Sequence, residues 1–287
     1  MQKRLQVQLL ASRSAASSRS SMFCEMPTGH KFLNPFLKYY VECGSQLTWN
    51  MMDAEMLETA IFRLKLEIVR KIGVRKGMTV VDVGCGQGGF TAAVAKTVGK
   101  HGKVLAVDIS DEYLDEFTKR VDKYHVKERV TFSQADSADL RAVVSDEAAD
   151  MVVSYRLLEE LKQARDIDKI VKEMARIVKK HGRVCITELS TKAKNKAEET
   201  YIRLHKESGD CFFSPDEIVE AMKNAKLTRI QTRLFDTNIW FSPELAKQDM
   251  GFAQVWFDEA VEKSLGPLIE RYGMKYPALQ TFSGIKA

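Results

Sequence analysis

Residues 80–91 read Val80-Val81-Asp82-Val83-Gly84-Cys85-Gly86-Gln87-Gly88-Gly89-Phe90-Thr91. An apolar run followed by a glycine-rich turn is typical of a buried strand that ends in a tight loop and continues into a helix. The free amide groups at the start of such a helix attract an anionic ligand group. This stretch therefore predicts a ligand-binding turn at the carboxyl end of a strand.

Two classes of enzyme use a turn of this kind. Gly84, Gly86 and Gly89 match the G-x-G-x-x-G spacing of dinucleotide-binding enzymes, so an NAD-dependent oxidoreductase is one interpretation. Asp82 completes the pattern Asp-x-Gly-x-Gly-x-Gly, and further acids, Asp108 and Asp136, follow where the next two apolar runs end. This combination resembles the class I S-adenosylmethionine (SAM) dependent methyltransferases and favours that family over the oxidoreductases.

The resemblance implies SAM as the cofactor and assigns a role to each part of the motif. The glycine turn lets the main chain approach the amino-acid end of SAM. Asp108 is expected to accept hydrogen bonds from both ribose hydroxyls, and Asp136 from the adenine amine. No metal is expected. The residues expected to bind the cofactor are Asp82, Gly84, Cys85, Gly86, Gly88, Asp108, Ile109, Asp136, Ser137 and Ser154.

The rest of the chain alternates between strand and helix patterns, which favours an α/β fold with helices on both faces of a parallel sheet. The resemblance implies a doubly wound, Rossmann-like sheet of seven strands, mostly parallel, with helical cap additions. Its last strand, within residues 276–284, should run antiparallel between strands five and six. The other strands are expected at 80–83, 103–108, 130–136, 150–154, 183–188 and 227–235. An amphipathic helix is expected over 168–180, followed by a turn at Lys180-His181-Gly182.

Composition divides the chain into three parts. Residues 1–21 are rich in Arg and Ser and contain no acid, which indicates a leader such as an organellar transit peptide, or else a disordered extension. Residues 22–56 are predicted to form an N-terminal helical cap. Residues 57–287 should hold the methyltransferase domain, with a helical insertion near 243–272 marked by an apolar stripe of Phe252, Val255, Trp256, Ala260, Val261 and Leu265.

The charge and the cysteines of the chain indicate its binding partners and its cellular compartment. The formal net charge of the chain is +5, but Lys3, Arg4, Arg13 and Arg19 precede the first acid, so no nucleic-acid surface is indicated. The cysteines include no C-x-x-C pair, which favours reduced thiols and argues against a zinc site. No stretch reaches the roughly 20 apolar residues of a membrane span. We expect a soluble intracellular protein, cytoplasmic or, with a transit peptide, in an organellar matrix.

Methyl transfer from a sulfonium is an in-line displacement, so the enzyme mainly has to align the acceptor and exclude water. Tyr155 and Glu188 are the predicted catalytic residues, because they follow strands four and five at the edge where the sulfonium should lie. Nearby alternatives are Ser154, Arg156, Glu159, Tyr201, His205 and Glu207, and Tyr39, Tyr40 and Trp49 are candidates for a lid.

The aromatic-rich segments outside the sheet and the lack of a basic patch favour a partly apolar small molecule as the methyl acceptor. A protein or RNA methyltransferase and a SAM-binding protein without transfer activity are the alternatives. The chain does not contain the N-terminal Tyr-Asp-x-Met-Asn signature of quinone-biosynthesis methyltransferases, which argues against that subfamily.

Overall fold

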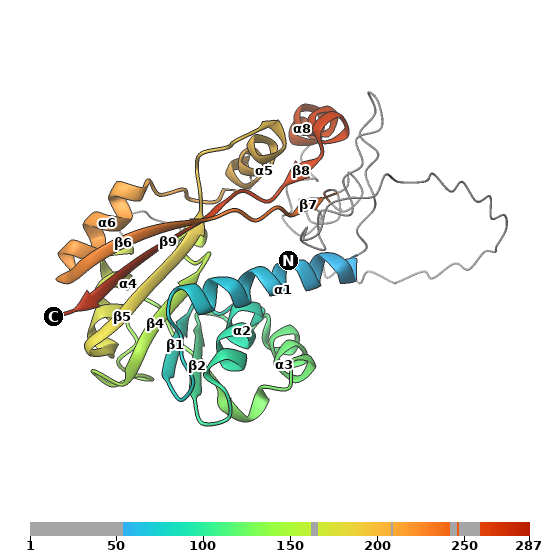
Figure 1. Ribbon diagram of the computed structural model, residues 1–287. Helices are drawn as coiled ribbons and strands as arrows, with labels where there is room; N and C mark the ends of the chain where they lie inside the picture. Colours follow the sequence, from blue (N-terminus) through green and yellow to red (C-terminus); the bar gives the residue numbers. More distant parts are fainter. Residues whose placement is uncertain (1–53, 162–165, 208, 242–245, 247–258) are drawn as a thin grey trace, which may run out of the picture. The chain divides into compact units, whose positions relative to one another are not determined.

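The computed structural model describes residues 54–161, 166–207, 209–241, 246 and 259–287 (Figure 1). Within them lies a seven-stranded sheet of order β3-β2-β1-β4-β5-β9-β6. The first five of these strands are parallel, and β9 runs antiparallel between β5 and β6. This order confirms the doubly wound fold and the position expected for the last strand.

The strands of the main sheet are β1 (Thr79–Val83), β2 (Lys103–Asp108), β3 (Val130–Gln134), β4 (Ala149–Tyr155), β5 (Val178–Leu189), β6 (Leu227–Phe235) and β9 (Leu279–Lys286). A separate pair is formed by β7 (Trp240–Phe241) and β8 (Met274–Lys275). The helices are α1 (Ala54–Lys71), α2 (Gly89–Val98), α3 (Leu114–Lys123), α4 (Ile167–Ile177), α5 (Lys196–Glu207), α6 (Pro215–Asn224) and α8 (Glu259–Tyr272), with short 3-10 turns η2 (Lys127–Arg129) and η3 (Leu158–Glu160).

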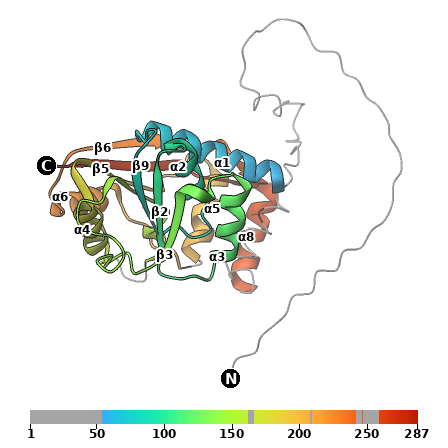
Figure 2. The ribbon, with the colours of Figure 1, turned by 90° about the horizontal axis from the view of Figure 1, so that it is seen from below.

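Alternate residues of the central strands supply the two layers of the core. Val80 and Val153 face α1, α2 and α3 on one side of the sheet, whereas Val81 and Val152 face α4 and α6 on the other (Figure 2). Because side chains of a strand alternate between its faces, a strand covered on both sides is apolar throughout. Asp82 is the exception in β1, and its side chain belongs to the layer of α1 and α2.

Several of the expected boundaries differ in the structure. The last strand spans Leu279–Lys286 rather than 276–284. β3 ends at Gln134 rather than 136, and the bond from the Ala135 N–H to the Asp108 carbonyl oxygen, at 2.8 Å, is the last bond of the ladder between β2 and β3. The helix expected over 168–180 ends at Ile177. The Lys180-His181-Gly182 turn lies inside β5 as a bulge, where the partners change from Ala149–Val178 to Met151–Arg183 and His181 has a φ of 62°.

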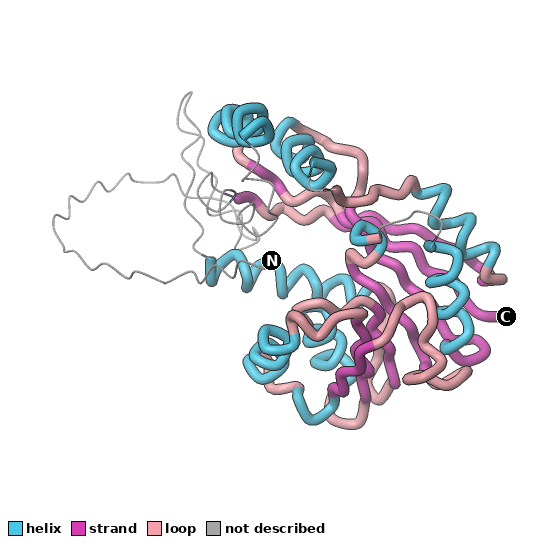
Figure 3. The backbone as a smooth tube through the Cα atoms, turned by 180° about the vertical axis from the view of Figure 1, so that it is seen from behind, coloured by secondary structure: helices cyan, strands magenta, loops and turns pink. Residues whose placement is uncertain are grey.

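The elements after β5 gather at one end of the sheet. Figures 1 and 3 show α5 and α8 side by side with β8, beyond the carboxyl end of β5. Lys275 of β8 joins these elements, because its buried ammonium forms a 2.8 Å ion pair with Glu198 of α5. The helix α8 covers the C-terminal part of the range of the expected insertion, whereas Phe252, Val255 and Trp256 lie outside the described residues.

Neither the expected leader nor most of the expected cap can be compared with the structure, because residues 1–53 are not described. The helix α1 passes through the expected boundary between residues 56 and 57. In the described part of the chain, no helix combines the length and the apolar character that crossing a membrane requires.

Candidate active site

The glycine turn connects β1 to α2 at the carboxyl edge of the sheet. The N–H groups of Gly84 and Cys85 both donate to the Val107 carbonyl oxygen, at 2.8 and 3.0 Å, which fixes the turn against the end of β2. Gly86 has a φ of 45°, and a Cβ built on it would meet no atom within 4 Å. The turn therefore leaves open space beside Gly86, where a ligand can approach the main chain.

Asp108 lies at the tip of β2, against this turn. Its Oδ2 accepts the N–H of Gly86 at 2.7 Å and its Oδ1 accepts the N–H of Ser110 at 3.3 Å. The half-buried carboxylate is thus oriented by the turn, and Ile109 beside it is 67% exposed. An exposed apolar side chain next to an oriented carboxylate suits a ligand with both a flat apolar part and hydroxyl groups.

Asp136 and Ser137 follow β3 on the neighbouring side. Asp136 is exposed, and its Oδ1 accepts the N–H of Ala138 at 2.8 Å. The Nε2 of Gln134 donates to the Ile109 carbonyl oxygen at 3.0 Å, so the tips of β2 and β3 are joined. The structure therefore brings the three strand-end segments predicted from the sequence to one edge of the sheet.

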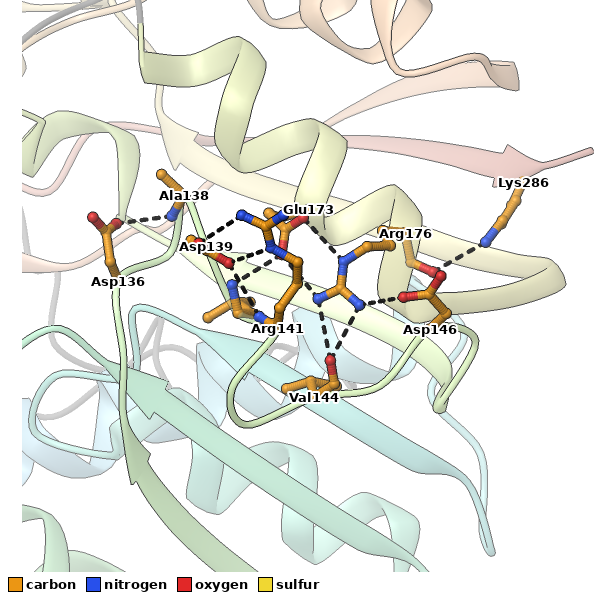
Figure 4. Close-up of polar contacts among 10 residues, drawn as sticks. Asp136, Ala138, Asp139, Arg141, Val144, Asp146, Glu173, Arg176 and Lys286 are labelled. Carbon is orange, nitrogen blue, oxygen red and sulfur yellow. Dashed lines mark hydrogen bonds and ion pairs between the residues drawn. The ribbon is translucent and has the colours of Figure 1, made fainter.

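The segment after Asp136 is held by ion pairs with α4 (Figure 4). Glu173 of α4 accepts the N–H of Leu140 at 2.9 Å, and its carboxylate pairs with Arg176 at 2.9 Å. Arg176 also donates to the Val144 carbonyl oxygen at 3.1 Å and contacts Asp146 at 2.6 Å. These contacts hold Leu140, Val144 and Asp146, in the loop that begins at Asp136, against α4.

Asp82 lies beneath the turn with none of its surface exposed. The hydroxyl of Thr91 donates to its Oδ2 at 2.6 Å, while Oδ1 has no hydrogen-bond partner among the described residues. Burial raises the pKa of this carboxyl to about 7, although the Thr91 hydrogen bond and the charge of Lys65 act in the opposite direction. Asp82 is therefore a proton-binding group under the turn.

Ser154 and Tyr155 end β4 next to β1. Ser154 pairs in register with Val83, and its buried hydroxyl has no hydrogen-bond partner in the described part of the chain. The ring of Tyr155 stacks on Phe90 at a centroid distance of 4.7 Å. Burial raises the pKa of Tyr155 well above 10, with the neighbouring Tyr276 adding to the effect, so its phenol stays protonated.

Glu188 is directed at the main chain that follows β4. Its Oε1 accepts the N–H groups of Leu157 and Leu158, at 3.2 and 3.1 Å, and Oε2 has no partner among the described residues. Burial, reinforced by the charge of Glu159, raises the pKa of Glu188 well above 4.5. The carboxyl thus anchors the start of η3 at the same edge as Tyr155.

Beside Tyr155 lies a group of buried polar residues, some of which the sequence analysis missed. The Tyr276 hydroxyl is 3.3 Å from that of Tyr155 and 3.4 Å from Nη1 of Arg156, and Arg156 pairs with Glu159 at 2.5 Å. Tyr276 precedes β9, and the sequence predicts it only as the first residue of the last strand. Its distance of more than a hundred positions from Tyr155 left no local signal for this contact.

The helix α5, which carries the alternative site residues Tyr201, His205 and Glu207, also contributes. The Nδ1 of His205 is 2.6 Å from Oδ2 of Asp210, and its ring stacks on the buried Tyr201 at 4.5 Å. The Cys211 N–H donates to the Glu159 carbonyl oxygen at 2.7 Å, which ties this segment to η3. In contrast, Glu207 is exposed and pairs with Arg203 at 3.6 Å.

Two further expectations concern features that the structure does not test. The proposed lid residues Tyr39, Tyr40 and Trp49 lie outside the described residues. Among the described residues there is no group of three or more His, Cys, Asp or Glu side chains that could hold a metal ion.

Comparison with known proteins agrees with this geometry. The model of a family described as "Methyltransferase domain" matches residues 74–237, which is more than half of the chain. The demethylmenaquinone methyltransferase of Lactobacillus johnsonii is 31% identical over 122 residues, 42% of this chain and 48% of that protein. A ubiquinone/menaquinone biosynthesis C-methyltransferase of Idiomarina loihiensis is 33% identical over 118 residues, 41% of this chain and 45% of that protein. The chain thus spans just under half the length of these relatives.

Solved structures extend the likeness over most of the chain. A cyclopropane-fatty-acyl-phospholipid synthase-like protein from Lactobacillus casei has a TM-score of 0.65 at 18% identity, covering 82% of this chain and 94% of its own. A SAM-dependent methyltransferase from Aquifex aeolicus has a TM-score of 0.52 at 18% identity, covering 83% and 100%. Because the family model matches more than half of the chain, and the sheet order and the glycine turn agree with it, the chain belongs to the methyltransferase domain family.

Proposed function

We propose that this methyltransferase binds SAM across the glycine turn and transfers its methyl group to a partly apolar small molecule. The observation that carries the cofactor site is the hydrogen bond between Gly86 and Asp108, which places an oriented carboxylate beside open space at the turn. Gly84, Cys85, Gly86 and Gly88 would face the amino-acid end, Asp108 the ribose, and Ile109, Asp136 and Ser137 the adenine. Asp82 would act from beneath the turn through its charge, and Ser154 through its hydroxyl.

The transfer itself needs little covalent chemistry from the protein. A nucleophilic atom of the acceptor forms a bond to the methyl carbon, the carbon–sulfur bond breaks, and its electron pair stays on sulfur in S-adenosylhomocysteine (SAH). Tyr155 would contact the acceptor, because its neutral phenol can donate or accept a hydrogen bond at the tip of β4. Glu188 would act as a positioning residue by holding the main chain of Leu157 and Leu158.

Two observations support a partly apolar small molecule as the acceptor. Although the chain does not contain the N-terminal Tyr-Asp-x-Met-Asn signature, two of its relatives are named for demethylmenaquinone methylation and for ubiquinone/menaquinone biosynthesis, and a quinone is a partly apolar small molecule. In this chain, Phe90, Tyr155, Tyr276 and Tyr201 form a series of aromatic contacts that leads away from the turn. Aromatic walls of this kind suit a flat apolar ring.

Calorimetric titration tests the cofactor. We expect tight binding of SAM and SAH without added metal, and a loss of more than about 1.5 kcal/mol in Asp108→Ala, because hydrogen bonds to a charged acceptor are removed. Asp111→Ala, an exposed carboxylate in the same loop, is the matched control and should bind as the wild type does. Tight binding of NADH with no binding of SAH would overturn the proposal.

Transfer of label from methyl-labelled SAM tests the acceptor. The enzyme is incubated separately with a reduced naphthoquinone, with bulk RNA and with unfolded protein. Label should enter the solvent-extractable quinol. Label in RNA or protein alone would replace the small-molecule acceptor by one of those macromolecules, and SAH binding without transfer to any of them would favour a binding protein.

A further inference from the structure

Lys65 of α1 reaches the start of α2, beside the glycine turn. Its half-buried side chain places Nζ 5.1 Å from the ring centroid of Tyr155. A Cβ built on Gly89 would lie only 2.5 Å from the same nitrogen, so the ammonium occupies the space that a side chain at position 89 would need. A cation thus lies against the first residue of α2.

This cation has no counter-ion in contact among the described residues. The charged groups around it are Asp82 under the turn, Glu58 on α1, Arg120 on α3 and Arg156 after β4. None of them is within ion-pair distance of Lys65, and Glu58 is already paired with Lys123 at 2.8 Å. Burial, followed by the charges of Arg120 and Arg156, lowers the pKa of Lys65 to about 7. An anion placed at Nζ would therefore relieve an unfavourable environment.

The start of α2 independently favours an anion at this place. Gly88 is the N-cap and offers no side chain to cap the helix, and the first turn of α2 contains no acidic residue. The partial positive charge of the helix end is therefore not balanced from within the helix. Lys65 and the start of α2 thus both contribute positive charge beside the turn.

We propose that Lys65 binds the carboxylate of the amino-acid end of the cofactor, together with the start of α2. The proposal rests on the proposed function, since it takes SAM to lie across the glycine turn. It adds a contact from α1, outside the motif of β1 and α2, that senses whether the amino acid of the cofactor is complete. Lys65 is then a specificity-determining residue that distinguishes SAM and SAH from adenosyl thioethers without an amino acid.

The experiment compares SAH with 5′-methylthioadenosine, which keeps the adenosine and the sulfur but has no amino-acid end. Calorimetry is carried out with the full chain as wild type, Lys65→Met and the control Lys71→Met, which removes an exposed lysine from the last turn of the same helix. We expect Lys65→Met to weaken SAH binding at least tenfold and to leave 5′-methylthioadenosine binding within twofold. Lys71→Met should change neither.

A second variant tests the same contact without removing the lysine. Gly89→Ala places a methyl group where Nζ now lies, and the flexible end of Lys65 has to move aside. The same selective loss of SAH affinity is expected, and Lys65→Arg, which keeps the charge, should retain more SAH affinity than Lys65→Met does.

The outcomes separate this inference from the proposed function. Unchanged SAH binding in a folded Lys65→Met protein overturns the role of Lys65 alone. An equal loss for SAH and 5′-methylthioadenosine also overturns it, because α1 would then only support the turn. If Lys65→Met does not fold, Gly89→Ala decides by the same two criteria. A wild-type protein that binds neither compound overturns the proposed function and, with it, the role of Lys65.

Discussion

Asp82 combines a buried charge with a position directly under the turn that the proposed cofactor covers. A carboxyl whose pKa is raised in the folded state makes folding less favourable once it ionises. One of its oxygens has Thr91 as a partner, whereas the other has none among the described residues. The position is therefore costly for stability, and its charge is more readily explained by ligand binding than by folding.

Replacing Asp82 by Asn tests this cost. The folded-state pKa of about 7 lies above the ordinary 3.8, so the carboxyl contributes stability that is present below pH 4 and is lost as the pH rises towards 7. Asp82→Asn keeps the shape and cannot ionise, so it should exceed the wild type by at least about 1 kcal/mol at pH 7.5 and resemble it below pH 4.

Urea unfolding at the two pH values measures the difference. Thr91→Val, which removes the hydroxyl but leaves the charge, is the comparison variant and should be destabilised at pH 7.5. A variant Asp82→Asn that is less stable than the wild type at pH 7.5 would show that the carboxylate, with Lys65, stabilises the fold.

Some residues of the candidate site could be predicted from the sequence, and others could not. Asp108 and Asp136 were identified because each follows an apolar run, and parallel strands bring their carboxyl ends to one edge. Neither Lys65 nor Tyr276 directly follows a predicted parallel strand. Lys65 is one of two lysines on the amphipathic helix α1, and its approach to Gly89 depends on how α1 packs against α2. Contacts between distant elements of this kind are set by tertiary packing.

At the scale of elements, α4 combines packing with control of a loop. Its apolar side lies against the sheet, while Glu173 and Arg176 bind the segment that begins at Asp136. Burial alone would raise the pKa of Glu173, but the hydrogen bonds from Arg176 and Leu140 outweigh it and the pKa is lowered. The ionised carboxylate therefore stabilises the folded state.

Glu173→Gln should cost about 1 to 2 kcal/mol of unfolding free energy at pH 7, because a charged acceptor of several hydrogen bonds is neutralised. The lowered pKa means that this stabilisation is present above the ordinary pKa of 4.5 and is lost as the pH falls below it. The gap between wild type and variant in urea unfolding should thus close towards pH 3.5. Glu199→Gln, which breaks an exposed pair on α5, should stay within about 0.5 kcal/mol at either pH. A gap for Glu173→Gln that is independent of pH would contradict an ionic role.

Elements were predicted best where turn residues mark both of their ends. β2 and β6 have the expected bounds of 103–108 and 227–235, since each is a short run between turn residues. The end of α4 was misplaced because Val178 continues the helical spacing of apolar residues although the chain has already entered β5. The two-residue strands β7 and β8 are too short to leave a pattern.

For the whole domain, the sheet links the proposed cofactor site to every layer of the core. The turn is hydrogen-bonded to β2, β4 pairs with β1, and the polar group around Tyr155 reaches β9 and α5 through Tyr276 and Tyr201. A ligand bound at this edge is expected to oppose unfolding of the described domain as one unit, since binding to the folded state alone shifts the equilibrium by mass action.

Thermal unfolding with and without SAH measures this coupling. At a concentration about 100 times the dissociation constant, SAH should add about 2.7 kcal/mol, which for a domain of this size raises the melting temperature by roughly 5 to 10 °C. Asp108→Ala should show a much smaller shift at the same concentration, because its affinity is lower, whereas Asp111→Ala should shift as the wild type does. NADH should leave the melting temperature unchanged. A rise with NADH but none with SAH would contradict the assignment of the turn to SAM, and a shift in Asp108→Ala equal to that of the wild type would remove Asp108 from the site.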